Sequence, residues 1–426
     1  MIQIYKITTT ILYPLLFLFL YIRKIIGKED TKRFKEKILI SHFNVKKKVN
    51  SKLIWFHAAS IGEFKSIIPI IKELNIYEKN FEFLITSTTL SSGNLAKIEL
   101  SKFPNAEHRY FPLDVPFLVD KFLNLWKPDK IFFVDSEIWP NLILKTKKYN
   151  IPVALINARL TFKSFNRWMM FPTTSKKIFG IFNLFLCSNI ETKNNLEKLN
   201  LKNIYFKGNI KLIDKIDAGK INNNNEDFLL NNRFWFAAST HKEEDMFCLK
   251  THLELKKKFR DIVTILAPRH VERSNEIYDL CKKLNLNAQI LNNNQTILRE
   301  NEIIIINQFG VLQNYYKYAK SVFIGKSTIK KLQSGGGQNP IEAAKLNCKI
   351  YHGPYIYNFE DIYNTLGEIN ICKKISNFQE LSKNLILDLE NNRPKGELSN
   401  PIKHLEQKTL NDTMTLIKGF LKNENK

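Results

Sequence analysis

The chain has 426 residues, 44% of them hydrophobic, which is enough material for two domains with separate cores. Its formal net charge of +24 suits nucleic acid, anionic lipid or a phosphorylated substrate, although a general enrichment in Lys, Asn and Ile explains part of the excess. No Lys/Arg-rich run is interleaved with aromatic residues, so we expect no nucleic-acid partner. The five cysteines are scattered without a C-x-x-C pair, which argues against a disulfide framework or a structural zinc site and indicates a reducing compartment.

The N-terminus carries a membrane-like segment. Ile7–Ile22 is apolar but shorter than the ~20 residues that cross a bilayer comfortably. Basic residues follow it from Arg23 to Lys37, so the positive-inside rule places the rest of the chain in the cytoplasm. We expect residues 1–30 to form an uncleaved membrane anchor helix, spanning or monotopic; a signal peptide and a buried core helix are the alternatives.

In the first half, apolar runs that predict strands alternate with amphipathic runs that predict helices. A basic amphipathic stretch at about 30–45 precedes them. The predicted strands are Leu53–Ala58, Glu82–Thr86, Lys130–Val134, Val153–Ile156 and Leu184–Cys187, and the predicted helices include Ile61–Leu74 and Trp139–Tyr149.

The second half repeats this alternation after an Asn-rich tract. Its predicted strands are Phe234–Ala238, Ile262–Ala267, Glu302–Ile306, Ser321–Ile324 and Lys349–Tyr351, and its predicted helices include Arg273–Leu284, Leu312–Ala319, Ile341–Leu346 and the terminal Ile402–Leu421. Strands separated by helices predict parallel sheets. We therefore expect an N-terminal Rossmann-like domain at 31–209, a linker at 210–230, a C-terminal Rossmann-like domain at 231–400, and a helix at 401–426 that packs back on the N-terminal domain.

One short motif occurs in both halves. Residues 54–60 read Ile-Trp-Phe-His-Ala-Ala-Ser, and residues 234–239 read Phe-Trp-Phe-Ala-Ala-Ser. Each copy predicts a buried strand that ends in a hydroxyl residue. Glu63 and Glu243 then lie three residues after Ser60 and Thr240, the spacing of a capping box. Because strand, turn and helix form the unit of a doubly wound sheet, we predict two α/β domains facing a central cleft that brings two substrates together.

A glycine-rich segment follows the predicted strand Ser321–Ile324. It reads Gly335-Gly336-Gly337-Gln338-Asn339-Pro340-Ile341-Glu342. Three glycines let the backbone approach a ligand closely, and Asn339, Pro340 and Glu342 suit the N-cap, first and third positions of a helix whose free N–H groups bind phosphate. The alternative is an ordinary capped helix in which Glu342 reaches back to the Asn339 amide.

Acidic residues follow two predicted strands of the first half. Glu63 could act as a general base, or it could simply close the capping box of its helix, and one oxygen could not easily do both. Asp135 and Glu137 lie at the end of another strand, where they could be catalytic or serve as solvated caps.

Three cations occupy comparable positions. Lys211 lies where the linker leaves the first domain, and Arg159 follows a first-domain strand, where it suits an anionic acceptor. Arg269, in Pro268-Arg269-His270, could pair with phosphate oxygens through its planar guanidinium. For Lys211, an ordinary solvated surface lysine is the alternative.

Taken in order, these motifs resemble the 3-deoxy-D-manno-octulosonic acid (Kdo) transferases, glycosyltransferases that build the inner core of lipopolysaccharide. The resemblance runs from the N-terminus to about residue 365. Its segments are Ala59–Glu63, Glu137–Asn141, Asn157–Leu160, Ala238–His241, Pro268–His270, Gly336–Glu342, Gly353-Pro354 and Asn358-Phe359.

The resemblance implies a GT-B fold, CMP-Kdo as donor, and a lipid A precursor (tetraacyldisaccharide 1,4′-bisphosphate, lipid IVA) as acceptor. It implies inverting transfer without a metal ion or other cofactor, at the cytoplasmic face of a bacterial inner membrane. By position, Glu63 matches the general base, and Glu137 and Lys211 match groups that stabilise the transition state. The positions that match CMP contacts are Pro268, Arg269, Phe309, Gly310, Val311, Asn339, Pro340, Ile341 and Glu342.

Five positions, in four segments, depart from the family pattern. Asp135-Ser136-Glu137 stands where the family usually has Glu-Thr-Glu, Gln338 where it has His, Val311 where it has an acidic residue, and Gly325-Lys326-Ser327 where it has Gly-Gly-Ser. Because the acids and bases assigned to the chemistry are unchanged, we expect activity to be retained.

Two other functions remain open. A GT-B transferase that joins a UDP-sugar to a lipid-linked acceptor would use the same glycine loop and ribose-binding glutamate. A membrane-tethered basic protein that binds anionic lipid or nucleic acid would explain the charge, but not the strand-end carboxylates in both halves.

Overall fold

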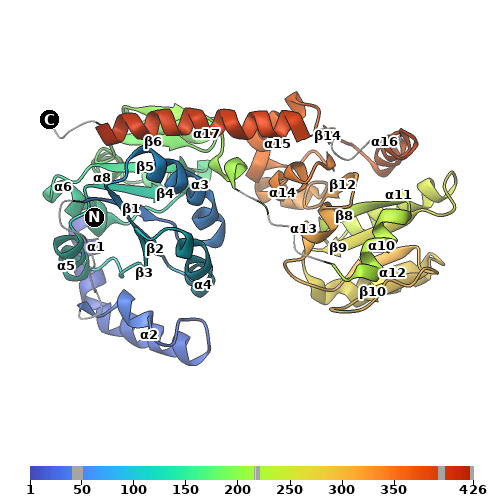
Figure 1. Cartoon of the computed structure of the whole chain (residues 1–426), viewed down its shortest axis with the longest axis horizontal. Helices are drawn as coiled ribbons and strands as arrows, with labels where there is room; N and C mark the ends of the chain where they lie inside the picture. The colour runs from blue at the N-terminus through green and yellow to red at the C-terminus, as the bar shows by residue number, and fades with distance from the viewer. Residues whose placement is uncertain (41–50, 215, 217–220, 392–398, 423–426) are drawn as a thin grey trace. The chain divides into compact units, whose positions relative to one another are not determined.

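The computed structural model describes residues 1–40, 51–214, 216, 221–391 and 399–422. The chain divides into two compact units (Figure 1): unit 1 comprises Met1–Asp214 with Glu406–Lys426, and unit 2 comprises Lys215–Leu405. Residues 41–45 of the expected basic stretch, residues 215 and 217–220 of the expected linker, and residues 423–426 of the expected terminal helix region lie outside the described residues.

Unit 1 is built on a parallel sheet, which has seven strands among the described residues, in the order β3-β2-β1-β4-β5-β6-β7. The strands are β1 (Lys52–His57), β2 (Phe81–Ser87), β3 (Ala106–Tyr110), β4 (Lys130–Val134), β5 (Val153–Ala158), β6 (Leu184–Cys187) and β7 (Ile204–Phe206). The strand order reverses between β1 and β4. At such a point the loops that leave the two strands diverge and open a crevice for ligands.

Helices cover both faces of this sheet (Figure 1). The helical elements of unit 1 are α1 (Ile2–Ile11), α2 (Tyr13–Ile25), α3 (Ile61–Tyr77), α4 (Leu90–Glu99), α5 (Pro116–Trp126), α6 (Pro140–Lys148), α7 (Phe162–Met169), α8 (Pro172–Phe179), α9 (Ile190–Glu197), most of α17 (Ser399–Lys422), and the 3-10 turns η1 (Phe34–Lys37), η3 (Leu100–Lys102) and η4 (Ile210–Ile213). All of β4 is buried, as expected for a central parallel strand with helices on both faces. The C-terminal helix α17 adds Met414, Ile417 and Phe420 to the core on one of these faces.

Unit 2 repeats the plan with its own parallel sheet, ordered β10-β11-β9-β8-β12-β13-β14 in the described part of the chain. The strands are β8 (Phe234–Thr240), β9 (Val263–Pro268), β10 (Ala288–Leu291), β11 (Ile303–Ile306), β12 (Ser321–Ile324), β13 (Lys349–His352) and β14 (Cys372–Lys374). Its helices are α10 (Asn223–Asn231), α11 (Glu244–Lys256), α12 (Ser274–Lys283), α13 (Leu312–Tyr316), α14 (Ile341–Lys345), α15 (Glu360–Glu368), α16 (Phe378–Glu390), and the 3-10 turns η5 (Val271–Arg273), η6 (Lys330–Gly335) and η7 (Tyr357–Phe359). Here the order reverses between β8 and β12.

The predicted α/β class with parallel sheets is confirmed, and the repeated motif supplies the pivot strand of each sheet. β1 pairs with both β2 and β4, and β8 pairs with both β9 and β12. The strands that sequence analysis missed, namely β3, β7, β10 and β14, all lie at sheet edges. An edge strand has a neighbour on one side only, so its sequence is shorter or more polar than that of a central strand; β3, for example, reads Ala-Glu-His-Arg-Tyr.

The expected anchor segment is not one continuous helix. Residues 2–25 form two helices, α1 and α2, bent by 56° at Leu12. Within the described residues no single helix is long and apolar enough to cross a membrane. The bent pair α1 and α2 is long and apolar enough only when the two helices are taken together. The helix α1 is docked on unit 1, because the Tyr5 hydroxyl donates to Asp114 at 2.9 Å and the Asn141 amide donates to Thr9 at 3.1 Å.

The tract expected to be a linker is structured at both ends. Its first residues form η4, where Ile210 and Leu212 are buried in unit 1. Its later residues form α10, which belongs to unit 2. Asparagine enrichment therefore marks helix caps here as much as loops: the Asn209 and Asn222 side chains accept backbone N–H groups at the starts of these two elements.

Candidate functional site

Glu63 lies on the first turn of α3, directly after the carboxyl end of β1. Ser60 caps the helix by accepting the Glu63 N–H at 3.4 Å. The Glu63 carboxylate reaches back, where Oε1 accepts the Ser60 hydroxyl at 2.6 Å and Oε2 accepts the Ala59 N–H at 2.8 Å. The expected capping role is therefore present, with Ala59 rather than Ser60 donating its backbone N–H.

The surroundings of Glu63 favour its protonated form. Burial raises the pKa of the Glu63 carboxyl above its usual range. The hydrogen bond from Ser60 opposes this effect, while the nearby carboxylates of Asp135 and Glu137 raise the pKa further. A carboxylate with a raised pKa is a stronger base, which is the property that proton abstraction requires.

Asp135 and Lys211 form an ion pair at the end of β4, 2.9 Å between Nζ and Oδ2. Asp135 has a left-handed backbone with φ of 65°, which turns the chain sharply out of the strand. Its backbone carbonyl accepts the Arg159 N–H at 3.3 Å, so the ends of β4 and β5 are tied together. Lys211, expected to leave the domain with the linker, instead belongs to η4 in unit 1 and brings a cation to this strand end.

Glu137 lies in a small polar network that sequence analysis did not foresee. The Trp139 indole N–H lies 2.9 Å from Glu137 Oε2 and 3.2 Å from His57 Nε2, and Glu137 Oε2 is 3.4 Å from the same His57 nitrogen. His57 is fully buried at the end of β1, with Nδ1 2.9 Å from the Thr86 hydroxyl. The available signal was a lone histidine that ends an otherwise apolar strand.

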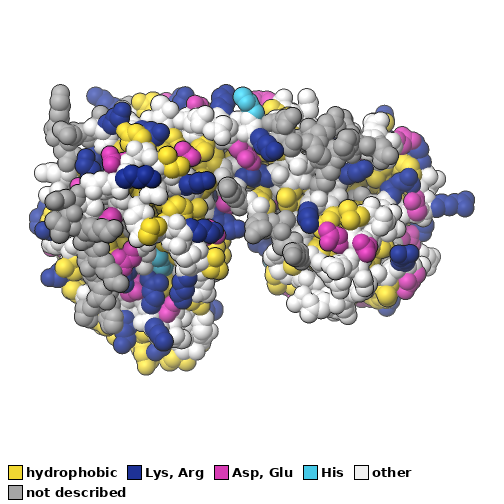
Figure 2. Space-filling view, viewed as in Figure 1, with side chains coloured by type: hydrophobic (Ala, Val, Ile, Leu, Met, Phe, Trp, Pro, Cys, Tyr) yellow, Lys and Arg dark blue, Asp and Glu magenta, His cyan; other side chains and the backbone are white. Residues whose placement is uncertain are grey.

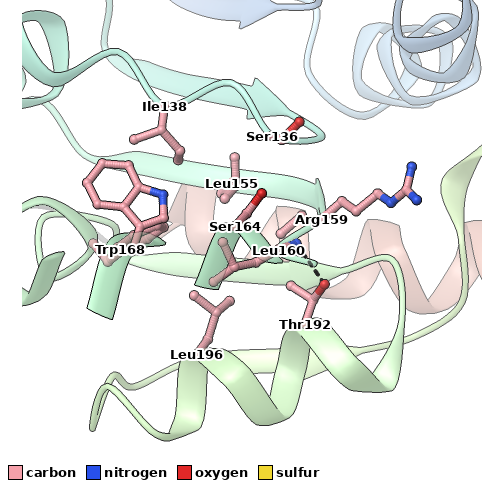
Figure 3. A pocket seen from close by; sticks show the side chains of 11 residues that line it. Ser136, Ile138, Leu155, Arg159, Leu160, Ser164, Trp168, Thr192 and Leu196 are labelled. Carbon is pink, nitrogen blue, oxygen red and sulfur yellow. Dashed lines mark hydrogen bonds between the residues drawn. The ribbon is translucent and has the colours of Figure 1, made fainter. Parts of the chain in front are cut away.

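A cavity of about 180 Å³ opens beside these residues (Figure 3). Ser136 and Arg159 lie at the polar end of this cavity, and Trp168 lies at the opposite end (Figure 3). The wall between them is apolar and includes Leu155, Leu160 and Leu196. Thr192 fixes one wall, because its hydroxyl accepts the Leu160 N–H at 2.8 Å. The cavity therefore combines an apolar interior with a cationic group at the strand ends.

The second copy of the motif differs from the first at the helix start. The predicted capping glutamate, Glu243, is wrong: it is exposed and has φ of 82°, and α11 begins one residue later at Glu244. The Glu244 carboxylate is fully buried and accepts the His241 N–H at 3.0 Å. The same carboxylate also accepts the N–H groups of Lys326, Ser327 and Thr328, between 2.6 and 3.0 Å, so it shapes the loop that follows β12.

The expected CMP contacts of unit 2 lie at other strand ends. Pro268 is buried at the end of β9, and the exposed Arg269 donates its N–H to the Thr240 carbonyl at 2.9 Å. Phe309 and Gly310 precede α13 and are exposed. Gly310 has φ of 76° and open space where a Cβ would stand.

The glycine loop is held by its own chain. A Cβ on Gly336 would meet the Tyr355 carbonyl at 2.4 Å, and Gly337, with φ of 82°, lies against Ile356. The Asn358 side chain donates to the Gly335 carbonyl at 2.6 Å. These contacts explain why glycine occurs there without a ligand, and they give Asn358 of the Asn-Phe motif a structural role.

The predicted capping role of Glu342 is wrong. The helix α14 begins at Ile341, as in the predicted helix Ile341–Leu346, but one residue after the Pro340 start that the cap motif indicated. The Asn339 side chain accepts the Ile341 N–H at 3.1 Å. Glu342 instead accepts the Gln313 side-chain amide at 2.9 Å, so it joins α14 to α13 directly after the Phe309–Val311 turn. Within the described residues no hydrogen bond links Arg269 to Asn339 or Glu342.

Charge is dispersed on the face drawn in Figure 2, where Lys and Arg side chains alternate with acidic, polar and apolar groups. In the part of the chain that the structure describes, no group of three or more His, Cys, Asp or Glu side chains is arranged to hold a metal ion.

Comparison with known proteins identifies the family. A family model described as 3-deoxy-D-manno-octulosonic-acid transferase (kdotransferase) matches residues 32–213. The chain is 32% identical to the 3-deoxy-D-manno-octulosonic acid transferase of Rickettsia bellii and 30% identical to that of Rickettsia typhi, over 99% of this chain and 100% of each relative. It is 28% identical to the Haemophilus influenzae enzyme of the same name, over 81% of this chain and 80% of that protein.

Solved structures share the fold. A glycosyltransferase from Rickettsia africae matches with a TM-score of 0.59 at 14% identity, covering 88% of this chain and 100% of that one. The UDP-GlcNAc 2-epimerase of Neisseria meningitidis matches with a TM-score of 0.57 at 15% identity, covering 86% of this chain and 100% of that one. The sheets are thus those of GT-B-like proteins, and the chain belongs to the 3-deoxy-D-manno-octulosonic acid transferase family of glycosyltransferases, which act in lipopolysaccharide biosynthesis.

Proposed function

We propose that this protein transfers Kdo from CMP-Kdo to a phosphorylated glycolipid, a lipid A precursor such as lipid IVA, with inversion and without a metal ion or other cofactor. The observation that carries the proposal is Glu63: a half-buried carboxylate with a raised pKa at the point where the first sheet reverses its strand order. Membership of the family supports Kdo transfer as the reaction, and Glu63 is the residue that we assign as its general base.

Glu63 removes the proton from the acceptor hydroxyl, and the oxygen attacks the anomeric carbon of Kdo opposite the phosphate. The bond to the phosphate oxygen breaks, and CMP leaves with the electron pair. Lys211 and the Glu137 network hold the polar surroundings of this step in fixed geometry. Groups that are already oriented stabilise developing charge without the cost of reorganising solvent.

In unit 2, the donor's cytidine ribose hydroxyls bind Glu342, whose carboxylate is held by Gln313. The phosphate binds Arg269, an exposed guanidinium at the end of β9. Pro268, the Phe309-Gly310-Val311 turn and Asn339-Pro340-Ile341 complete the nucleotide contacts. Phosphate held by arginine and backbone donors leaves no step that requires a divalent cation.

In unit 1, the acceptor enters beside Glu63, and Arg159 pairs with one of its phosphates. The cavity behind Arg159 (Figure 3) has apolar walls suited to the start of an acyl chain. The helices α1 and α2 expose a row of large apolar side chains and lie in the cytoplasmic leaflet of the inner membrane, where the acceptor is embedded. The docking of α1 through Tyr5 and Thr9 supports an interfacial rather than a spanning position.

The direct test mixes the purified full chain with CMP-Kdo and lipid A precursor in detergent and weighs the lipid product by mass spectrometry. We expect the acceptor mass to increase by whole Kdo units with release of one CMP per unit. Release of UDP from a UDP-sugar instead would support the alternative transferase. Salt-dependent binding to anionic vesicles with no product from either donor would support a lipid-binding protein.

A further inference from the structure

Lys326 adopts a backbone conformation that disfavours lysine. Its φ is +58°, in the left-handed region where a Cβ crowds the backbone. The family pattern has glycine at this position, in the Gly-Gly-Ser sequence that here reads Gly325-Lys326-Ser327. Backbone strain of this kind persists where the surrounding structure fixes it, and it concentrates at functional sites.

Two hydrogen bonds fix Lys326 at the reversal point of the second sheet. Its N–H donates to Glu244 Oε2 at 2.6 Å, the oxygen that also accepts the His241 N–H at 3.0 Å. Its carbonyl accepts the Gly337 N–H at 2.6 Å. Lys326 therefore lies between the end of β8 and the glycine loop, in the crevice position that binds ligands in doubly wound sheets.

Two basic side chains near this position, those of Lys326 and Arg269, have no acidic partner among the described residues. Neither Lys326 nor Arg269 forms an ion pair within the described part of the chain. The neighbouring acids are already engaged, Glu244 by backbone donors and Asp245 by Thr240 and Arg273. The His241 ring lies 5.8 Å from that of His270 at the end of β9. Burial lowers the pKa of His241; the Ser239 carbonyl and the Glu244 carboxylate oppose this effect, and the Lys326 cation adds to it.

We propose that the Lys326 ammonium binds the phosphate of the nucleotide donor, as an additional contact that glycine at this position cannot provide. This inference rests on the proposed function and names one more donor-binding residue for it. The strained backbone is retained because it carries the side chain to the phosphate.

The variant Lys326→Gly tests this without disturbing the fold, since glycine adopts φ of +58° more readily than lysine. We expect unit 2 to unfold at the same or a higher temperature, while the Kd for CMP rises about tenfold, as for loss of one hydrogen bond to a charged group. Cytidine, which lacks the phosphate, should bind to the variant as it binds to the wild type. Lys326→Arg should restore most of the CMP affinity.

Lys127→Gly is the matched control, because Lys127 also has a left-handed backbone (φ of 45°) and lies in unit 1 at the end of α5. It removes the same charge and the same strain, and it should leave CMP binding unchanged. An equal loss of CMP and cytidine binding in Lys326→Gly, or none, would overturn the inference. Failure of the wild-type chain to bind CMP at all would instead overturn the proposed function.

Discussion

At the scale of single residues, the groups assigned to chemistry also hold the backbone. Each Glu63 oxygen accepts one hydrogen bond from the residues just before its helix. A carboxylate offers about four lone-pair positions, so each oxygen keeps one free for a proton. The two roles that seemed exclusive in the sequence are therefore compatible in the structure, and the general-base assignment stays a prediction.

Replacing Glu63 with Gln should lower kcat by about 10²–10⁴-fold, because the amide keeps the shape of the side chain but cannot take up the proton. The Kd for CMP should stay unchanged, since the nucleotide contacts are in unit 2. Glu73→Gln on the same helix is the control and should retain full activity. Wild-type turnover in the Glu63 variant would remove this residue from the mechanism.

The pH dependence follows from the raised pKa of Glu63. A base acts only when it is ionised, so kcat/KM should fall as the pH drops through a value above the ordinary 4.5. Because the Glu137 carboxylate raises this pKa, Glu137→Gln should move the acidic limb to lower pH even as it lowers the maximal rate. An unmoved limb would show that another group controls it.

Glu244 and Glu243 form a natural matched pair. Glu244→Gln replaces a buried acceptor of backbone N–H groups with an amide that has only one oxygen, so unit 2 should lose roughly 2 kcal/mol or more of unfolding free energy. Glu243→Gln, at the exposed neighbouring position, should change it by less than about 0.5 kcal/mol. Urea unfolding followed by hydrogen exchange of unit 2 peptides measures both; similar values would contradict the role given to Glu244.

At the scale of elements, burial decides which segments the sequence reveals. The central strands are enclosed on both faces and read as apolar runs, as in Ile303–Ile306, where all four residues are buried isoleucines. Edge strands and helix ends depend on neighbours that are distant in sequence, so the patterns there are weaker. The segment Ile7–Ile22 is apolar enough to suggest one helix, but Pro14, at the first turn of α2, favours a helix start there and accompanies the bend.

The exposed apolar side of α2 should bind membranes. Leu18 and Phe19 are 54% and 56% exposed, although they are large and apolar. The double variant Leu18→Asp/Phe19→Asp should weaken binding to anionic phospholipid vesicles at least about tenfold, because each side chain contributes ~1.5–3 kcal/mol when it enters an apolar phase. Leu230→Asp is the control, since Leu230 is 65% exposed in unit 2. Equal sedimentation of the two proteins with vesicles would count against an interfacial α2.

At the scale of the whole molecule, the chain returns to unit 1 after completing unit 2. In Figure 1 the helix α17 (red) lies along unit 1, where the Phe420 ring meets that of Phe132 of β4 at 5.3 Å between centroids. Residues far apart in the sequence thus share one core, and unit 1 depends on a segment that follows unit 2 along the chain.

Truncating the core side of α17 should weaken unit 1 alone. Ile417 is fully buried, and Ile417→Ala should lower the unfolding free energy of unit 1 by about 2–5 kcal/mol. Hydrogen exchange should accelerate in β4 and β5 peptides and stay unchanged in β8 and β9 peptides. Leu387→Ala, at a half-exposed position of α16, is the control and should leave unit 1 unaffected. Equal acceleration in both units would mean that they unfold together.

The sequence by itself determined the fold class, the central strands of both sheets as apolar runs, and the strand-end positions of Glu63, Glu137 and Arg269. It could do so because buried parallel strands and helix starts each produce a recognisable pattern within a few consecutive residues. The catalytic and CMP-binding assignments came from family resemblance and remain predictions. Only the tertiary structure showed Lys211 paired with Asp135, His57 beside Glu137, and Glu244 rather than Glu243 as the organising acid. The first two contacts join residues from separate elements, and the third depends on the left-handed backbone of Glu243. A contact between distant residues and a single backbone angle leave no periodic pattern in the sequence.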